Sequence, residues 1–210
     1  MTTNTAVMIC GHGSRNDGAI EQFNKLAGHF SDRLPQFQVE SGFLEFASPV
    51  IRTGLEKLKA QGAKRIVCVP GMLFAAGHVK NDLPSEVNNF GAENPDIEMI
   101  YASELGIDSR LLEAAKQRIE AAEKNTSEAI ERSETLLMVV GRGTNDPDAN
   151  SNINKVARML WEGMGFGWAE VSYSGVAFPL VDAGLEKAVK LGYKRIIVFP
   201  FFLFTGILVQ

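Results

Sequence analysis

Hydrophobic and polar positions along the chain alternate between two periods, and this alternation predicts strands that are followed by helices. Short apolar runs bounded by glycine, proline or polar residues are typical of buried parallel strands. Between them, apolar residues recur every three or four positions, as on one face of a helix. In the first half of the chain this pattern predicts strands at 6–10, 37–45, 65–70 and 97–101, and helices at 19–34, 49–61, 82–90 and 108–124. Such alternation predicts an α/β fold with a parallel sheet covered by helices on both faces.

The second half of the chain repeats the first at an offset of 130 residues. Positions 6–74 and 136–204 align without a gap and share 21 identical residues at 69 positions. The shared residues include prolines, glycines and the motif "GLEK", which begins at Gly54 and again at Gly184. A match of this length predicts an internal duplication.

The repeat divides the chain into two tandem lobes, which we expect at residues 1–127 and 128–210. A polar stretch without apolar periodicity, 125–134, is the expected linker. The second lobe stops soon after its third predicted strand, whereas the first continues for about 50 residues beyond the equivalent point. We therefore expect the second lobe to be incomplete, as in a C-terminally truncated chain.

Composition narrows the class of protein. The chain is 45% hydrophobic and 22% charged, as in globular domains, and its net charge of −4 gives no electrostatic footprint for nucleic acid. No apolar run approaches the roughly 18 residues of a membrane span, and the N-terminus lacks a signal-peptide pattern. We expect a cytoplasmic protein without nucleic-acid or membrane partners, in which Cys10 and Cys68 are buried, reduced thiols. No feature indicates an oligomeric state.

The loops after the first three predicted strands each carry one side chain that can bind a metal ion. These are His12 in "GHGSR", Glu45 in "LEFASP" and His78 in "FAAGHVKND". Because the carboxyl ends of parallel strands meet at one edge of a sheet, the three loops can converge on one crevice. Two imidazoles and a carboxylate suit Co²⁺, Ni²⁺, Fe²⁺ or Zn²⁺ and do not select among them.

Each candidate alone also fits an ordinary solvated side chain, and the remaining histidine, His29, is assigned a structural role in a predicted helix. The repeat favours a shared function. At the offset of 130 the three candidates become Arg142, Gly175 and Leu208, while the strand–helix frame persists. Nucleotide-binding glycine motifs are absent, and Ser14 lies outside the two glycines, unlike the serine of a hydrolase elbow.

Three motifs in order, "GHGSR", "GFLEFASP" and "VPGMLFAAGHVKND", together with the duplication, resemble the class II tetrapyrrole chelatases. The most similar group is the sirohydrochlorin chelatases, of the cobalt-inserting CbiX type or the iron-inserting SirB type. The resemblance extends over both repeats. It implies two tandem chelatase-like, flavodoxin-like lobes with the substrate in the cleft between them. It also implies a lyase-type enzyme that inserts a metal ion into sirohydrochlorin without nucleotide hydrolysis.

By motif match, the metal-handling histidines fall on His12 and His78, and their acidic partner falls on Glu45. Co²⁺ insertion for cobalamin biosynthesis is the expected reaction, with siroheme-forming Fe²⁺ insertion, Ni²⁺ insertion or a non-catalytic metal- or tetrapyrrole-binding module as alternatives. Arg15, Lys80 and Ser14 are the candidates for binding the substrate, although solvated surface charges explain the two cations equally well. Longer cobalt-inserting members carry a C-terminal iron–sulfur region, and this chain ends before it, so we expect no such cluster.

Overall fold

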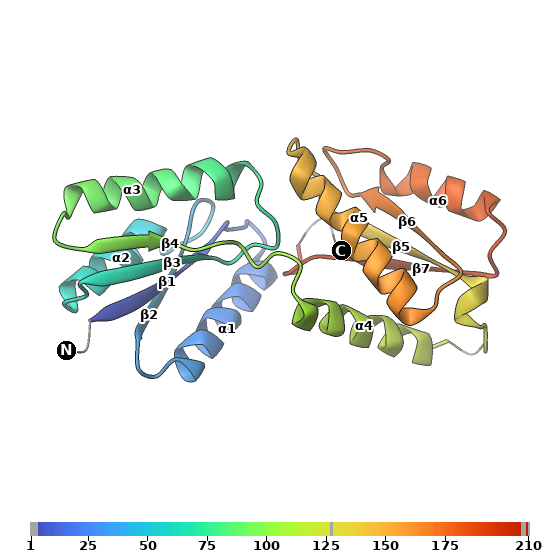
Figure 1. The fold of residues 1–210 in the computed structure, drawn as a ribbon, viewed down its shortest axis with the longest axis horizontal. Coiled ribbons are helices and arrows are strands. Elements are labelled where there is room, and N and C mark those ends of the chain that lie inside the picture. Colours follow the sequence, from blue (N-terminus) through green and yellow to red (C-terminus); the bar gives the residue numbers. More distant parts are fainter. Residues whose placement is uncertain (1–3, 127, 207–208, 210) are drawn as a thin grey trace. The chain divides into compact units, whose positions relative to one another are not determined.

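The computed structural model describes residues 4–126, 128–206 and 209, which form two compact units (Figure 1). The first unit comprises residues 1–106 together with 203–210, and the second comprises 107–202. Each unit is built on a parallel sheet that helices cover on both faces. The α/β fold class predicted from the alternating pattern is therefore confirmed.

The sheet of the first unit has four parallel strands in the order β2-β1-β3-β4. Their bounds are β1 (Thr5–Gly11), β2 (Gln38–Phe43), β3 (Arg65–Pro70) and β4 (Glu98–Tyr101). Strand β1 pairs with β2 on one side and with β3 on the other. The strand order reverses at β1, and the carboxyl end of a strand at such a switch point is where open α/β sheets bind ligands.

Helices of the first unit cover both faces of this sheet. Their bounds are α1 (Asp17–Arg33), α2 (Ile51–Ala60) and α3 (Leu83–Glu93), with a single π-helical turn, η1 (His78–Asp82), before α3. On one face, Leu55 of α2 and Phe90 of α3 pack in the same fully buried cluster as Met8 of β1. On the other face, Phe23 of α1 packs with Ile9. Burying each such side chain contributes roughly 1.5–3 kcal/mol to the stability of the fold. The strands are therefore held firmly between the helices on both faces.

The second unit repeats the central part of this arrangement. Its sheet has the order β6-β5-β7, from β5 (Thr135–Gly141), β6 (Trp168–Tyr173) and β7 (Arg195–Pro200). Its helices are α4 (Ser109–Lys124), α5 (Pro147–Met164) and α6 (Val181–Lys190), with a short 3₁₀ turn, η2 (Arg132–Glu134). The strand register also recurs at the offset of 130, since Ala6 is paired with Gln38 and Leu136 is paired with Trp168. The duplication predicted from the sequence is thus matched residue by residue in the two sheets.

The compact units do not divide where the sequence repeat does. The expected lobes meet at residues 127 and 128, whereas α4 lies in the second unit and the expected linker, 125–134, lies inside it. Glu123 near the end of α4 explains the difference, because it forms ion pairs with Arg132 at 2.7 Å and Arg195 at 3.3 Å. The Glu123 side chain is only 15% exposed, so these ion pairs attach α4 to the second sheet.

Both cysteines are buried and free, as predicted. A hydrogen bond with Cys68, together with burial, raises the pKa of the Cys10 thiol well above its usual value. Among the described residues, no helix is long and apolar enough to cross a membrane.

Candidate metal centre

A tight turn at the end of β1 places His12 at the edge of the first sheet. Gly13 adopts a φ of 95°, and a Cβ atom there would collide with the backbone carbonyl of Glu45. The N–H of Glu45 in turn donates a hydrogen bond of 3.1 Å to the carbonyl of His12. In the second unit, Gly143 approaches Gly175 in the same way with a φ of 82°. The glycine turn is therefore a property of the fold, because both units have it. This agrees with the inference from the repeat that the backbone is shared and the candidate metal ligands are not.

His78 is the first residue of a helical segment, and the predicted start of this helix was wrong. The sequence pattern placed residues 74–82 in a loop and began the helix at Asp82, whereas helical structure begins at His78. The first turn is π-helical, because the N–H of Leu83 donates to the carbonyl of His78, five residues earlier. Such single π turns have no simple periodicity signal, and they often mark functional sites.

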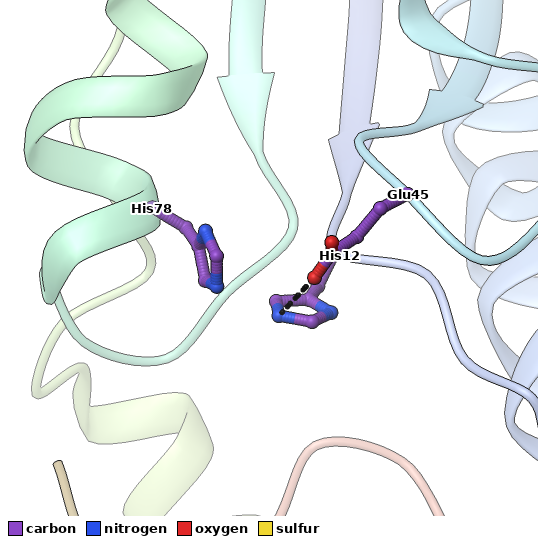
Figure 2. Close-up of side chains that lie close together, drawn as sticks. All are labelled: His12, Glu45 and His78. Atoms are coloured by element: carbon purple, nitrogen blue, oxygen red, sulfur yellow. Dashed lines mark ion pairs between the residues drawn. The ribbon is translucent and has the colours of Figure 1, made fainter.

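Side chains from these three elements converge. Figure 2 shows His12 after β1, Glu45 in the loop after β2 and His78 after β3, with their side-chain ends turned toward one another. Within the described residues they form a group whose potential ligand atoms all lie within 4.8 Å of one another. The His12 and His78 rings meet edge to face with centroids 4.5 Å apart. The structure thus brings together the three residues that the sequence pattern selected.

Hydrogen bonds hold both imidazoles in an orientation that is typical of metal ligands. The Nδ1 atom of His12 lies 2.9 Å from the carbonyl oxygen of Gly13, and Nδ1 of His78 lies 2.7 Å from the Asp82 carboxylate. Because both partners are acceptors, each Nδ1 acts as the donor, which leaves the lone pair of a neutral ring on Nε2. A histidine whose second nitrogen is held by a carboxylate or carbonyl is the usual arrangement of a metal ligand. Sequence reasoning missed Asp82, although its spacing of four residues from His78 was a usable signal.

The distance between His12 and Glu45 is close to that between two ligands of one divalent ion. The Nε2 atom of His12 lies 3.6 Å from Oε1 of Glu45, too far for a hydrogen bond. Two ligand atoms at about 2.1 Å from a tetrahedral ion are separated by about 3.4 Å. Three protein ligands leave at least one coordination position for another group, as catalytic metal sites do. The side chains are 32–44% exposed, so an ion and a larger ligand have access to them.

The other candidate residues lie on the same turns, with differing roles in the local structure. Ser14 accepts a hydrogen bond of 3.0 Å from the N–H of Asn16, which caps α1, so its hydroxyl helps to shape the turn. Arg15 is exposed, with its guanidinium carbon 4.9 Å from the ring centroid of Phe46. Lys80 is exposed on η1, two residues after His78. His29 is exposed on α1 and is not part of the metal-competent group.

Two of the three positions that correspond to the candidate ligands in the second repeat lie within the described residues. Arg142 and Gly175 occupy the positions of His12 and Glu45 in the second unit, where the turn has the same backbone form. The position equivalent to His78 is Leu208, which lies outside the described residues. Within the described part of the chain, the metal-competent group occurs in the first unit and not in the second.

Several known proteins similar to this chain are sirohydrochlorin chelatases, named for cobalt or for iron. The family model CbiX matches residues 6–122 and again residues 136–210. A sirohydrochlorin cobaltochelatase of Priestia megaterium is 36% identical over 206 residues, which cover 98% of this chain and 66% of that relative. A sirohydrochlorin ferrochelatase of the same organism is 33% identical, with 98% of this chain and 75% of the relative covered.

The solved structure of SirB from Bacillus subtilis with Fe³⁺ matches with a TM-score of 0.84 at 27% identity, covering 98% of this chain and 79% of that one. This match confirms the chelatase-like two-lobed fold. The chain spans just under two thirds of the cobaltochelatase and about three quarters or more of the other two proteins.

Proposed function

The chain belongs to the CbiX family, and we propose that it inserts a divalent metal ion, Co²⁺ in the first place, into sirohydrochlorin by direct metalation. The observation that carries the proposal is the exposed group of His12, Glu45 and His78 at the carboxyl ends of the strands. Both imidazoles are held through Nδ1, so that two Nε2 lone pairs are available to one ion.

Metal insertion requires two kinds of chemistry at one place. The ion must be held until the macrocycle arrives, and two pyrrole N–H protons must leave as nitrogen–metal bonds form. In the proposed reaction His12 and His78 hold the ion through Nε2, and the Glu45 carboxylate offsets part of its charge. The positive charge of the ion promotes deprotonation of the approaching pyrrole nitrogens.

The two protons need acceptors that lie beside the reacting nitrogens. Glu45 and one of the histidines are basic groups within the site, and each can take a proton as its bond to the ion is released. The balance is one ion and one free-base macrocycle giving one metalated macrocycle and two protons. No step calls for nucleotide hydrolysis. Exposure of the site lets water carry both protons away after transfer.

Iron is the second candidate metal. Relatives that are 33% and 30% identical to this chain are sirohydrochlorin ferrochelatases, and a donor set of two imidazoles and one carboxylate accepts Fe²⁺ as readily as Co²⁺. Discrimination among metals has to be measured as relative rates. We propose competition assays with Co²⁺, Fe²⁺ and Ni²⁺ under anaerobic conditions, in which the faster insertion rate at equal free metal identifies the preferred substrate.

The basic test is insertion of cobalt into sirohydrochlorin, followed by the change in the absorbance spectrum. We expect the chain to produce many equivalents of metalated product per protein, whereas a carrier module would stop at one. The variant His78→Ala should lose at least 100-fold in rate, because both a metal ligand and a candidate proton acceptor are removed.

A matched control uses the exposed histidine on α1. His29→Ala changes the same residue type outside the cluster and should keep the wild-type rate. Circular dichroism verifies that both variants are folded. Undiminished insertion by folded His78→Ala would refute the role of His78, and a single stoichiometric turnover by the wild-type chain would replace the enzyme with a binding module.

A further inference from the structure

One exposed aromatic side chain beside the candidate metal centre takes no part in the proposed reaction. Phe46 follows Glu45 and adopts a φ of 61°, a left-handed conformation that is rare for bulky residues. Its side chain is large and apolar, yet the residue is 52% exposed. The ring stacks on His12 with centroids 6.2 Å apart and an interplanar angle of 30°. An exposed bulky residue with a left-handed backbone has two possible explanations, a requirement of the turn or a contact with a ligand.

The second unit separates these two explanations. Val176 occupies the position of Phe46, with a φ of 65° and an exposure of 58%. The left-handed backbone is therefore shared by both copies and belongs to the turn. The aromatic side chain is particular to the first unit, where the metal-competent group is found among the described residues. The aromatic ring, and not the left-handed backbone, therefore occurs together with the metal-competent group.

The ring of Phe46 makes a cation–π contact with the side chain of Arg15. The guanidinium carbon of Arg15 lies 4.9 Å from the ring centroid, within the range of about 6 Å for cation–π contacts. Among the described residues, no carboxylate lies within ion-pair distance of Arg15. The second unit has Asn145 at the position of Arg15, so cation and ring are both lost there. An exposed guanidinium without a carboxylate partner, close to the candidate metal centre, is able to bind an anionic group.

We propose that Phe46 is a positioning residue that holds Arg15 toward the peripheral carboxylates of the tetrapyrrole at the rim of the metal centre. The proposal rests on the proposed function, since it assumes a flat ligand with carboxylates at its edge. Arg15 makes the contact, and Phe46 restricts the long arginine side chain to the orientation in which the contact forms. Restricting a side chain before binding reduces the conformational entropy that is lost on binding.

The test measures binding of sirohydrochlorin to the metal-free protein by absorbance titration, which requires no turnover. Arg15→Gln should weaken binding about tenfold, because a charged hydrogen bond is lost. Phe46→Val should weaken it about two- to fivefold, the value of an exposed cation–π contact. The chain already carries valine in this backbone conformation at residue 176, so the fold tolerates the change. Phe46→Trp should restore binding, because an aromatic ring is retained.

The double variant decides between a positioning role and an independent contact. If Phe46 acts through Arg15, Phe46→Val has no further effect once Arg15→Gln is present. Fully additive losses, or wild-type binding by Phe46→Val, would overturn the proposal. Val176→Ala is the matched control in the second unit and should bind as the wild type does. A chain that binds the tetrapyrrole with this pattern but performs no insertion would refute the proposed function and leave this inference standing.

Discussion

Replacing Asp82 with alanine removes the carboxylate that accepts the Nδ1 proton of His78 at 2.7 Å. The histidine then loses the partner that fixes its tautomer and the direction of Nε2. Because Asp82 is four residues after His78 on the π turn, the change leaves the proposed metal ligands themselves in place. We therefore expect weaker metal binding in a protein that keeps His12, Glu45 and His78.

The structure also sets the size of this effect. Loss of a carboxylate behind a metal-binding histidine typically lowers metal affinity 10- to 100-fold. The His78 and Asp82 side chains are 44% and 53% exposed, so water can replace part of the lost interaction, which places the effect near the lower end. We expect about a tenfold loss for Asp82→Ala, or about 1.4 kcal/mol. Asp82→Asn keeps a neutral acceptor worth about half as much, so the expected loss is about threefold.

Cobalt affinity is measured by competition with a coloured chelator at fixed pH, without the tetrapyrrole. Asp32→Ala is a suitable control, because Asp32 is an exposed acidic residue on α1 outside the metal-competent group. The control separates the local hydrogen bond from a general loss of negative charge. Wild-type cobalt affinity in folded Asp82→Ala, or equal losses in Asp82→Ala and Asp32→Ala, would refute the reasoning.

Two further predictions concern the frame of the first unit. Gly13→Ala should lower the free energy of unfolding by about 1–3 kcal/mol, because a Cβ atom there meets the carbonyl of Glu45, whereas Gly28→Ala on open helix surface should raise it by about 0.5–1 kcal/mol. Urea denaturation compares the two, and equal stabilities would contradict the assigned close approach. Cys10 and Cys68 should resist alkylation at pH 8 in the native protein and react after denaturation, because the raised pKa of Cys10 keeps its thiol protonated and both thiols are buried. Mass spectrometry detects the labels, and rapid labelling of the native chain would contradict the buried positions.

Periodicity predicted the elements well where local sequence controls them. The predicted strand 65–70 is reproduced by β3 to the residue, and the predicted helix 108–124 differs from α4 by one residue. The candidate ligands were found for a topological reason, because parallel strands deliver their following loops to one edge. That argument needs only the parallel direction of the strands, which the alternation of strands and helices predicts.

Features that depend on contacts distant in sequence were not predicted. The attachment of α4 to the second unit rests on ion pairs of Glu123 with Arg132 and Arg195, and Arg195 is 72 residues away. The left-handed backbone of Phe46 has no local signal, because such conformations are normally associated with glycine. The role proposed for Phe46 became visible only when its distance to Arg15 was known.

The π turn before α3 makes the position of His78 depend on the number of residues as well as on their identity. A π turn holds one residue more than the α-helical turn that would replace it. If the same residues formed a regular α-helical turn with none deleted, His78 would be rotated by about 100° around the helix axis relative to α3. The histidine would then point away from His12 and Glu45, although every ligand would still be present in the sequence. Substitutions that replace the π turn with an α-helical turn should therefore weaken metal binding, although an inspection of the candidate ligands would class such a variant as intact.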